Sequence, residues 1–354
     1  MPNLDIHASK EYTMMVEPGI MDRLGELVLR VANPKKVCLV SDTNVSELFA
    51  EKATRSLQKE GFDVNVLILA PGEGTKSMSS LNRILEFLAE HEYTRSDILV
   101  ALGGGVIGDL TGFAAATYLR GIPFIQVPTT LLAAVDASIG GKTAINLKAG
   151  KNLAGAFWQP SLVLFDVDTV LELPEEQFKD GISEIIKSAV IGDAKLFDYL
   201  QTVENPKIID FTMECVMGAV KVKRDLVAKD ERDTGMRKLL NFGHTMGHAI
   251  ELVSDYKISH GRAVAIGMLA CAKAADKMGW SNRDCAIPIW QVIDKYGIDA
   301  KCPFDPHQLA AAALNDKKRS GDKISIVIPL EIGMGAIMDI PVHELEEFFR
   351  AGLE

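Results

Sequence analysis

The chain has 354 residues, of which 47% are hydrophobic and 24% charged, and it carries a formal net charge of −10. Because single hydrophobic cores stop growing beyond about 250 residues, this length predicts two domains. The acidic charge disfavours nucleic acid as a general partner, since affinity for it depends on lysines and arginines that displace counterions. The sequence has no apolar run long enough for a membrane span and no apolar signal core, which predicts a cytoplasmic protein.

Short apolar runs alternate with amphipathic segments over about the first 165 residues, which is the spacing of strands and helices. We expect buried strands at residues 36–42, 63–70, 96–102, 124–130 and 162–166. Strands that alternate with helices form parallel sheets, so this region predicts an α/β domain over residues 1–170.

The second half of the chain changes character near Pro174. Apolar residues there recur with helical spacing, at residues 175–192, 241–253 and 261–279. This periodicity predicts a mainly α-helical domain over residues 171–354. Residues 323–329 are typical of one late strand, which either returns to the first sheet or forms a small hairpin.

A glycine motif follows the strand at residues 96–102. Gly103, Gly105 and Gly108 satisfy G-x-G-x-x-G at a strand-to-helix junction, where free amides of the helix start attract a pyrophosphate. The acidic residue expected about twenty positions later for ribose is missing, so a turn needed only for helix–sheet packing is the alternative. Asp42 to Asn44, at the carboxyl edge of another strand, are candidates for the missing polar contacts or simply a helix N-cap.

Histidines, rather than cysteines, form the candidate metal ligands. The five cysteines lack CxxC spacing and are expected to be reduced and mostly buried. His244 and His248 share one helical face, Glu251 continues it, and His260 begins the next helix. With Glu184, which precedes an apolar helical run, two imidazoles would complete the three-ligand set of a catalytic zinc. Helix capping or an interface is the alternative, and spacing does not decide which histidine is not a ligand.

Several longer segments of the chain match the motifs of one protein family. Residues 103–146, followed by the segments GKNLAGAFWQP, SEIIK, NFGHTMGHAIE, HGRAVAIGM and DKKRSG, resemble the 3-dehydroquinate synthases. The motifs occur in order from Asp42 to Lys318, across both predicted domains. The resemblance implies a Rossmann-like NAD domain at the amino terminus and a helical domain at the carboxyl terminus, with zinc or cobalt bound.

The resemblance also implies roles for individual residues. The metal ligands are Glu184, His244 and His260, and His248 lies on the phosphate side. The implied NAD contacts are Asp42, Thr43, Asn44, Glu73, Lys76, Gly104, Gly105, Val106, Asp109, Thr129, Thr130, Lys142, Lys151, Thr169 and Glu172. The implied substrate-binding and catalytic residues are Asp136, Lys142, Asn152, Lys187, Lys223, Asp233, Arg237, Asn241, His248 and one or both of Lys317 and Lys318. Arg120 resembles an arginine offered across a homodimer interface to the neighbouring site.

Two positions depart from the family pattern. Asp233 stands where glutamate is usual, which shortens a carboxylate near the site by one methylene. Glu172 stands where threonine is common beside NAD.

The implied activity converts 3-deoxy-D-arabino-heptulosonate 7-phosphate into 3-dehydroquinate and phosphate. Its steps are transient oxidation by NAD, phosphate elimination, re-reduction and intramolecular aldol closure. The basic residues above suit this substrate because it carries both a carboxylate and a phosphate. Three alternatives are another sugar-phosphate cyclase, a metal-dependent polyol dehydrogenase that releases NADH, and a silent homologue that only binds nucleotide or partners.

Overall fold

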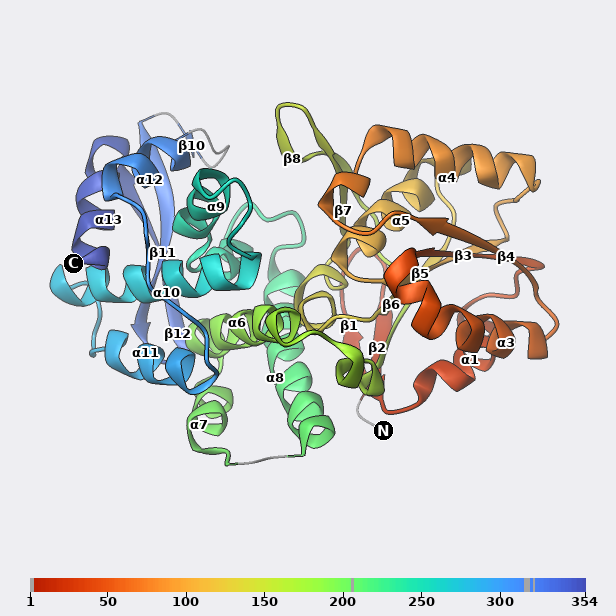
Figure 1. Cartoon of the computed structure of the whole chain (residues 1–354), viewed down its shortest axis with the longest axis horizontal. Coiled ribbons are helices and arrows are strands. Elements are labelled where there is room, and N and C mark those ends of the chain that lie inside the picture. The colour runs from red at the N-terminus through yellow and green to blue at the C-terminus, as the bar shows by residue number, and fades with distance from the viewer. Residues whose placement is uncertain (1–2, 205–206, 315–318, 321) are drawn as a thin grey trace. The chain divides into compact units, whose positions relative to one another are not determined.

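The chain divides into two compact units (Figure 1). The computed structural model describes residues 3–204, 207–314, 319–320 and 322–354. Unit 1 comprises Met1–Leu173 together with Ile208–Met217, and unit 2 comprises Pro174–Lys207 together with Gly218–Glu354. Lys317 and Lys318, two of the predicted substrate-binding residues, lie outside the described residues.

Unit 1 is built on a seven-stranded sheet. In sheet order its strands are β1 (Asn3–Ile6), β2 (Tyr12–Glu17), β9 (Leu162–Asp166), β6 (Phe124–Pro128), β5 (Ile98–Gly103), β3 (Lys36–Asp42) and β4 (Asp63–Leu69). All neighbouring strands are parallel except β1 and β2. The five predicted strands are confirmed, whereas β1 and β2 escaped prediction because neither is a long apolar run.

Helices cover both faces of this sheet. Helices α1 (Leu24–Val31) and α3 (Glu51–Lys59) pack on one face, and α4 (Met78–Glu90) and α5 (Gly105–Thr117) pack on the other. Strand β3 shows how one sequence serves both faces: Val37 and Leu39 join the first core, while Cys38 and Val40 join the second. This alternation has the period of two that a pleated strand imposes, with apolar residues at both phases because both faces are buried.

The order of the strands places a crossover beside β3. The chain passes from β3 to β4 on one side and then returns to form β5 on the other side of β3. Open parallel sheets bind ligands at the carboxyl ends of strands where the direction of winding reverses. Strand β3 ends at Asp42 and β5 ends at Gly103, so the predicted nucleotide contacts follow the two strands at this switch point.

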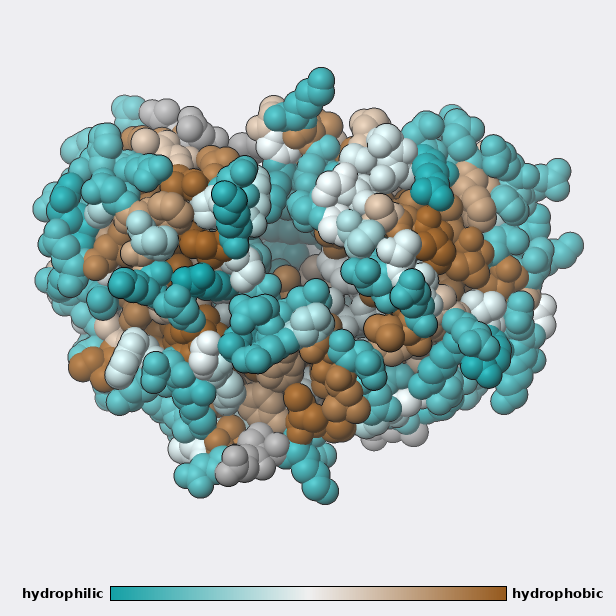
Figure 2. Space-filling view, in the orientation of Figure 1, coloured by the Kyte–Doolittle hydropathy of each residue, from teal (hydrophilic) through white to brown (hydrophobic). Residues whose placement is uncertain are grey.

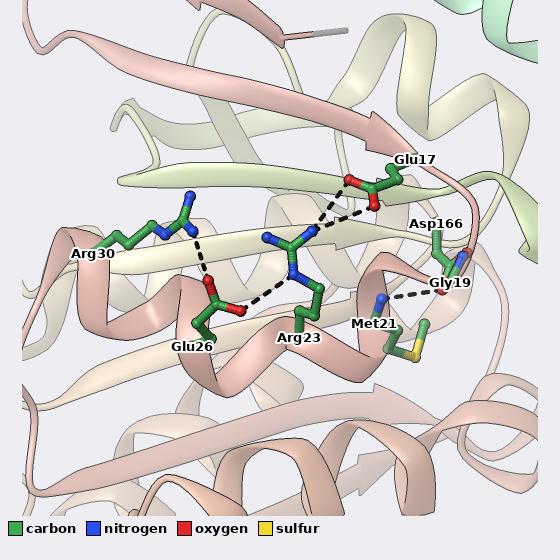
Figure 3. A network of polar contacts seen from close by, with 7 residues as sticks. All are labelled: Glu17, Gly19, Met21, Arg23, Glu26, Arg30 and Asp166. Atoms are coloured by element: carbon green, nitrogen blue, oxygen red, sulfur yellow. Dashed lines mark hydrogen bonds and ion pairs between the residues drawn. The ribbon is translucent and has the colours of Figure 1, made fainter. Parts of the chain in front are cut away.

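A short polar network joins the start of unit 1 to the end of β9 (Figure 3). Asp166 accepts hydrogen bonds from the amides of Gly19 at 2.8 Å and Met21 at 3.1 Å. Arg23 bridges Glu17, at 3.3 Å, and Glu26, at 3.2 Å. These contacts fix the turn after β2, where Gly19 has a left-handed φ of 70°.

A two-stranded hairpin, β7 (Lys142–Leu147) and β8 (Gly150–Phe157), packs on α4 and α5. Its polar, glycine-containing sequence gave no strand signal. It carries Lys142, Lys151 and Asn152, three of the predicted ligand-binding residues.

Unit 2 is mainly helical, as predicted. Its helices are α6 (Glu175–Gly192), α7 (Ala194–Thr202), the second half of α8 (Ile208–Lys229), α9 (His244–Val253), α10 (His260–Lys277), α11 (Ala286–Lys295), α12 (Pro306–Ala313) and α13 (Leu345–Leu353). Helix α10 is rich in alanine and glycine, is buried along most of its length, and packs against α6, α9, α11 and α13. None of the helices among the described residues is long and apolar enough to cross a bilayer.

A separate antiparallel sheet completes unit 2. It consists of β10 (Arg319–Ser320), β11 (Lys323–Glu331) and β12 (Met334–Pro341). Among the described residues β11 pairs only with β10 and β12, so the hairpin prediction for residues 323–329 is confirmed and a return to the first sheet is wrong. The face drawn in Figure 2 is mostly hydrophilic, with hydrophobic residues in small separate groups.

Candidate functional site

Three predicted metal ligands converge in unit 2. Glu184 lies in α6, His244 is the first residue of α9, and His260 is the first residue of α10. Glu184 Oε1 lies 3.5 Å from His244 Nε2 and 3.4 Å from His260 Nε2. One ligand atom from each residue lies within 4.8 Å of the others.

These separations fit a divalent ion. A tetrahedral zinc with bonds of about 2.1 Å holds neighbouring ligand atoms about 3.4 Å apart. The two oxygen–nitrogen distances equal that edge within 0.1 Å. One carboxylate and two imidazoles leave a fourth position open, which is the arrangement of catalytic rather than structural sites. Cobalt accepts the same donors, so the set does not choose between the two metals.

Each predicted ligand also makes a hydrogen bond or an ion pair through an atom that does not face the other two. His244 Nδ1 donates to the carbonyl of Phe242 at 3.1 Å, and His260 Nδ1 donates to Glu251 Oε2 at 3.1 Å. Both histidines therefore direct Nε2 towards Glu184, as metal-binding histidines usually do. The second carboxylate oxygen of Glu184 forms an ion pair with Lys187, and both of these side chains are only 1% exposed.

The protonation of the two histidines differs. Burial holds the pKa of His244 well below its ordinary value, although Glu184 acts in the opposite direction. Burial opposes the charged form of His260 too, but its hydrogen bonds to Glu184 and Glu251 raise its pKa to about 10. A divalent ion that binds here must therefore displace a proton from His260, so its binding competes with protons.

Local sequence explains why α9 and α10 begin at histidines. Gly243, with a φ of 77°, turns the chain into α9, and a side chain there would come 2.7 Å from the carbonyl oxygen of Val264. Asp180 accepts from the Ser259 hydroxyl at 2.6 Å and from the Gly261 amide at 3.0 Å, and so caps α10 at His260. Asp180 lies one helical turn before Glu184, so the cap also ties α10 to the part of α6 that carries the ligand.

The remaining predicted residues of unit 2 come from α6, α8, α9 and the turn before α9. Lys187 and His248 belong to the triad's surroundings, and the His248 ring centre lies 5.4 Å from that of His244 and 6.2 Å from that of His260. Lys223 is buried in α8. Arg237 and Asn241 belong to a 3-10 turn, η7 (Met236–Asn241), which leads directly to His244.

The loop before η7 is tightly held. Asp230 accepts hydrogen bonds from the amides of Thr234, Gly235 and Arg237, and the buried Arg237 guanidinium donates to the carbonyl of Glu231 at 2.5 Å. Asp233 has a left-handed φ of 59°, a conformation that aspartate tolerates better than most residues. The substitution of aspartate for the usual glutamate therefore falls in a conformationally demanding loop.

In unit 1, the glycine motif forms the start of α5. Gly104 is the N-cap residue of α5, and Gly105 and Val106 are its first helical residues. A side chain on Gly108 would come 2.4 Å from Gln126 Oε1, so this glycine is required for packing of the helix on the sheet. Packing also requires Gly103, where a side chain would come 2.8 Å from Ile107 Cβ. The free amides at Gly104 to Val106 keep the anion-binding geometry of a helix start.

Three further predicted contacts, Asp42, Thr129 and Thr130, lie at the carboxyl edge of the sheet. Asp42 Oδ1 accepts from the amides of Asn44 at 3.0 Å and Val45 at 3.1 Å, so Asp42 is a helix N-cap. Thr130 Oγ1 accepts from the Ala133 amide at 3.1 Å. The Thr129 hydroxyl is buried and has no hydrogen-bond partner among the described residues, which leaves it available to a ligand.

A polar network next to α5 combines residues predicted for NAD and for substrate. Lys76 donates to Asp109 Oδ2 and to Asn152 Oδ1, both at 2.5 Å. Glu73 accepts from Asn146 at 2.6 Å, and Asn146 in turn accepts from the Asn152 amide at 2.9 Å. Burial raises the pKa of Asp109, and Lys76 opposes that rise. Sequence reasoning missed Asn146, whose only signal was its place at the end of the glycine-rich segment.

The other predicted residues of unit 1 come from several elements. Asp136 lies in η5 (Ala133–Ala137), and Lys142 and Lys151 are exposed on the hairpin. The Thr169 hydroxyl donates to the carbonyl of Asp166 at 2.7 Å, and Glu172 is exposed. Arg120 is exposed after α5, with a left-handed φ of 67°.

Fold and ligand set together define the class of protein. The chain is similar to the crystal structure of 2-deoxy-scyllo-inosose synthase complexed with carbaglucose-6-phosphate, NAD+ and Co2+, with a TM-score of 0.88 and 25% identity over 99% of this chain and 100% of that one. The architecture is thus that of the sugar-phosphate cyclases.

Comparisons of sequence identify the family within this class. The model for the 3-dehydroquinate synthase N-terminal domain matches residues 66–180, and the model for the C-terminal domain matches residues 181–319. A 3-dehydroquinate synthase from Enterococcus faecalis is 40% identical over 342 residues, covering 96% of both chains. One from Thermodesulfovibrio yellowstonii is 42% identical over 331 residues, covering 92% of both. The chain belongs to the 3-dehydroquinate synthase family.

Proposed function

We propose that this protein converts 3-deoxy-D-arabino-heptulosonate 7-phosphate into 3-dehydroquinate and phosphate, as a carbon–oxygen lyase that uses NAD and either zinc or cobalt. The convergence of Glu184, His244 and His260 is the observation that carries this proposal. This convergence supports the proposal because it gives a member of the family a site that can bind a divalent ion. We also propose that the enzyme acts in the cytoplasm.

The triad would hold the divalent ion through Glu184 Oε1, His244 Nε2 and His260 Nε2. A bound divalent ion acidifies a coordinated hydroxyl, which supports oxidation of that alcohol by NAD. The chain's own contribution is to keep the three donors in place. Lys187 fixes the Glu184 carboxylate from the opposite side, and its buried ammonium adds positive charge where an anionic substrate would bind.

The substrate's two anionic ends call for different residues in unit 2. Arg237 suits the carboxylate because a guanidinium binds two oxygens at once, and its contact with the Glu231 carbonyl pre-orients the group. Lys223 and His248 suit the phosphate as cationic or hydrogen-bonding groups, and Asn241 supplies directional donors. Asp233 would orient these groups, within the limits of its shorter side chain.

In unit 1, NAD would bind at the switch point of the sheet. The amides of Gly104, Gly105 and Val106 suit the pyrophosphate, and the buried Thr129 hydroxyl offers a donor that no described residue uses. The wider set of proposed NAD contacts is Asp42, Asn44, Glu73, Lys76, Asp109, Thr130, Lys142, Lys151, Thr169 and Glu172. Lys142, Asn152 and Asp136 are proposed to reach the substrate as well.

A direct assay tests this proposal. The protein is incubated with the heptulosonate phosphate, NAD and zinc, and phosphate and dehydroquinate are measured together. We expect equal amounts of both products and no net NADH, because the hydride taken early in the cycle is returned later. NADH that accumulates with a polyol, and no phosphate release, would instead indicate a dehydrogenase.

The likeness to 2-deoxy-scyllo-inosose synthase makes another cyclase the second candidate. A hexose 6-phosphate lacks the carboxylate for which Arg237 is proposed, so its use as a substrate distinguishes the two candidate activities. Turnover of the hexose phosphate with no turnover of the heptulosonate would favour that candidate.

We further propose a homodimer in which the exposed Arg120 serves the neighbouring subunit's site. Its left-handed backbone projects the residue from an exposed turn, a conformation that non-glycine residues seldom adopt without a reason. Mixing Arg120→Ala subunits with subunits inactivated at His244 tests the idea. Mixed dimers should regain activity in one site, and a failure to regain any would refute the sharing.

A further inference from the structure

Glu251 is a buried carboxylate that none of the proposed roles uses. It lies in α9, two helical turns after His244, so His244, His248 and Glu251 share one helix face. Its side chain is 9% exposed, and its Oε2 lies 3.1 Å from His260 Nδ1. The contact joins α9 to the first residue of α10.

The contact determines which nitrogen of His260 is available. An ionised carboxylate only accepts hydrogen bonds, so His260 Nδ1 carries the proton that it donates to Glu251. Nε2 then faces Glu184 Oε1 at 3.4 Å. His244 is arranged in the same way, with a backbone carbonyl in place of the carboxylate.

We propose that Glu251 is a positioning residue, which holds the ring and the tautomer of His260 and thereby sets the affinity of the triad for its divalent ion. This inference rests on the proposed function, since it requires the triad to bind metal. A hydrogen bond from a ligand imidazole to a carboxylate restricts the ring and makes the opposite nitrogen a stronger donor. Such outer partners are typically worth about 10–100-fold in metal affinity.

A second arrangement of the same residues sharpens the test. Ligand atoms of His248, Glu251 and His260 also lie within 4.8 Å of one another, so Glu251 would be a ligand itself if the ion bound there. The geometry favours the positioning role. An ion in the second group would leave out His244 and Glu184, whose donor atoms already face each other and are held by Phe242 and Lys187.

Zinc affinity is the primary measurement, by competition with a chromophoric chelator. Glu251→Ala should bind zinc about 10–100-fold more weakly than the unmodified protein. Glu251→Gln should lie between the two, because its amide oxygen still accepts from Nδ1 but carries no charge. Circular dichroism and thermal melting establish that both variants fold. Affinity of the alanine variant within about twofold of the unmodified protein overturns the inference, whereas an unmodified protein that binds no zinc refutes the proposed function instead.

Spectra separate a positioning residue from a ligand. At saturating cobalt, Glu251→Ala should keep the visible absorption of the unmodified protein, because the carboxylate and both imidazoles still bind the ion. The proton on His260 Nδ1, observed by NMR in the zinc-loaded protein, should exchange faster with water in that variant. A changed cobalt spectrum, or zinc affinity that falls in His248→Ala but not in His244→Ala, would place the ion in the second group and overturn the proposal.

A matched control exists in the same unit. His307 Nδ1 bonds to Glu346 Oε2 at 2.7 Å, but this pair is exposed and joins α12 to α13. Glu346→Gln removes the same kind of carboxylate and should leave zinc affinity unchanged. A loss equal to that of Glu251→Gln would show that the effect is not specific to the triad and would overturn the inference.

Discussion

The two units assemble their candidate sites by different means. In unit 2, Glu184, His244 and His260 come from three helices and meet because α10 packs tightly against α6 and α9. In unit 1, the candidate nucleotide contacts lie just after the ends of neighbouring strands and on a hairpin. The candidate metal site therefore depends on helix packing, whereas the candidate nucleotide site depends on the topology of the sheet.

The charged pairs of the two sites differ in the same way, because one lies within a single helix and the other joins separate segments. Lys187 and Glu184 lie one turn apart on a single helix, so their separation is fixed by local geometry. Lys76 instead bridges Asp109 of α5 and Asn152 of the hairpin, so it depends on three segments staying together. Mutation of Glu184 or Lys187 should therefore affect metal binding, and mutation of Lys76 should affect the folding of unit 1.

The largest effect is expected when the triad itself is broken. His244→Ala removes a ligand and should lower turnover about a thousandfold or more, since stabilisation of charge by a metal is worth several kcal/mol. Zinc content and the rate of phosphate release check this. His343→Ala, which changes an exposed histidine of the same unit, should leave both unchanged. Full activity of His244→Ala with one bound ion would contradict the account.

The ion pair of unit 1 should show a stability effect that depends on pH. Lys76→Ala leaves Asp109 without its cation, which should cost about 2–4 kcal/mol of unfolding free energy near neutral pH. Burial already raises the pKa of Asp109, and without Lys76 it should rise further. The folded state then binds a proton more tightly than the unfolded chain, so the loss should shrink as pH falls towards the ordinary aspartate value of 3.8.

Urea unfolding at several pH values measures this dependence. The double variant Lys76→Ala with Asp109→Asn removes the buried charge and should recover most of the loss near neutral pH. A loss that is the same at all pH values would show that Lys76 contributes packing and hydrogen bonds rather than charge.

A smaller effect is expected where α10 approaches α6. A side chain on Gly261 would come 2.3 Å from the Cα atom of Asp180, so Gly261→Ala must push the helices apart. We expect a loss of about 1–3 kcal/mol in unfolding free energy and weaker zinc binding. Gly74→Ala, at a position with open space, serves as the control. If Gly261→Ala is destabilised but binds zinc as tightly as the unmodified protein, the metal site does not depend on this helix packing.

The cysteines should contribute nothing to either site. Burial raises the pKa of Cys38, Cys271 and Cys285 to about 12 and raises that of Cys215 as well, so their thiols stay protonated at neutral pH. These four buried thiols should therefore react slowly with thiol reagents, and the cobalt form of the protein should lack a thiolate charge-transfer band. An intense band of that kind would place a sulfur on the ion.

Sequence predicted the parts that depend on local pattern. The apolar strands of unit 1, the helical character of unit 2 and the start of α10 at His260 are confirmed. The prediction missed β1, β2 and the hairpin, whose residues are too polar or too few to produce a periodic signal. The five cysteines are free, as expected.

Other features needed tertiary structure. Nothing in the spacing of His244, His248 and His260 indicates that Glu251 faces His260 Nδ1, because that contact arises from the packing of α10 on α9. Likewise, Asn146 reaches Glu73 only when the hairpin meets the turn at Glu73. The composition of Ile208–Met217 does not indicate that this segment belongs to unit 1.

The position of the ion is the most direct test. Crystals of the zinc- or cobalt-loaded protein should give an anomalous difference peak about 2.0–2.2 Å from Glu184 Oε1, His244 Nε2 and His260 Nε2. Glu251 should remain bonded to His260 Nδ1, outside the coordination shell. A peak bound by His248 and Glu251, or one remote from all of these residues, would contradict the account.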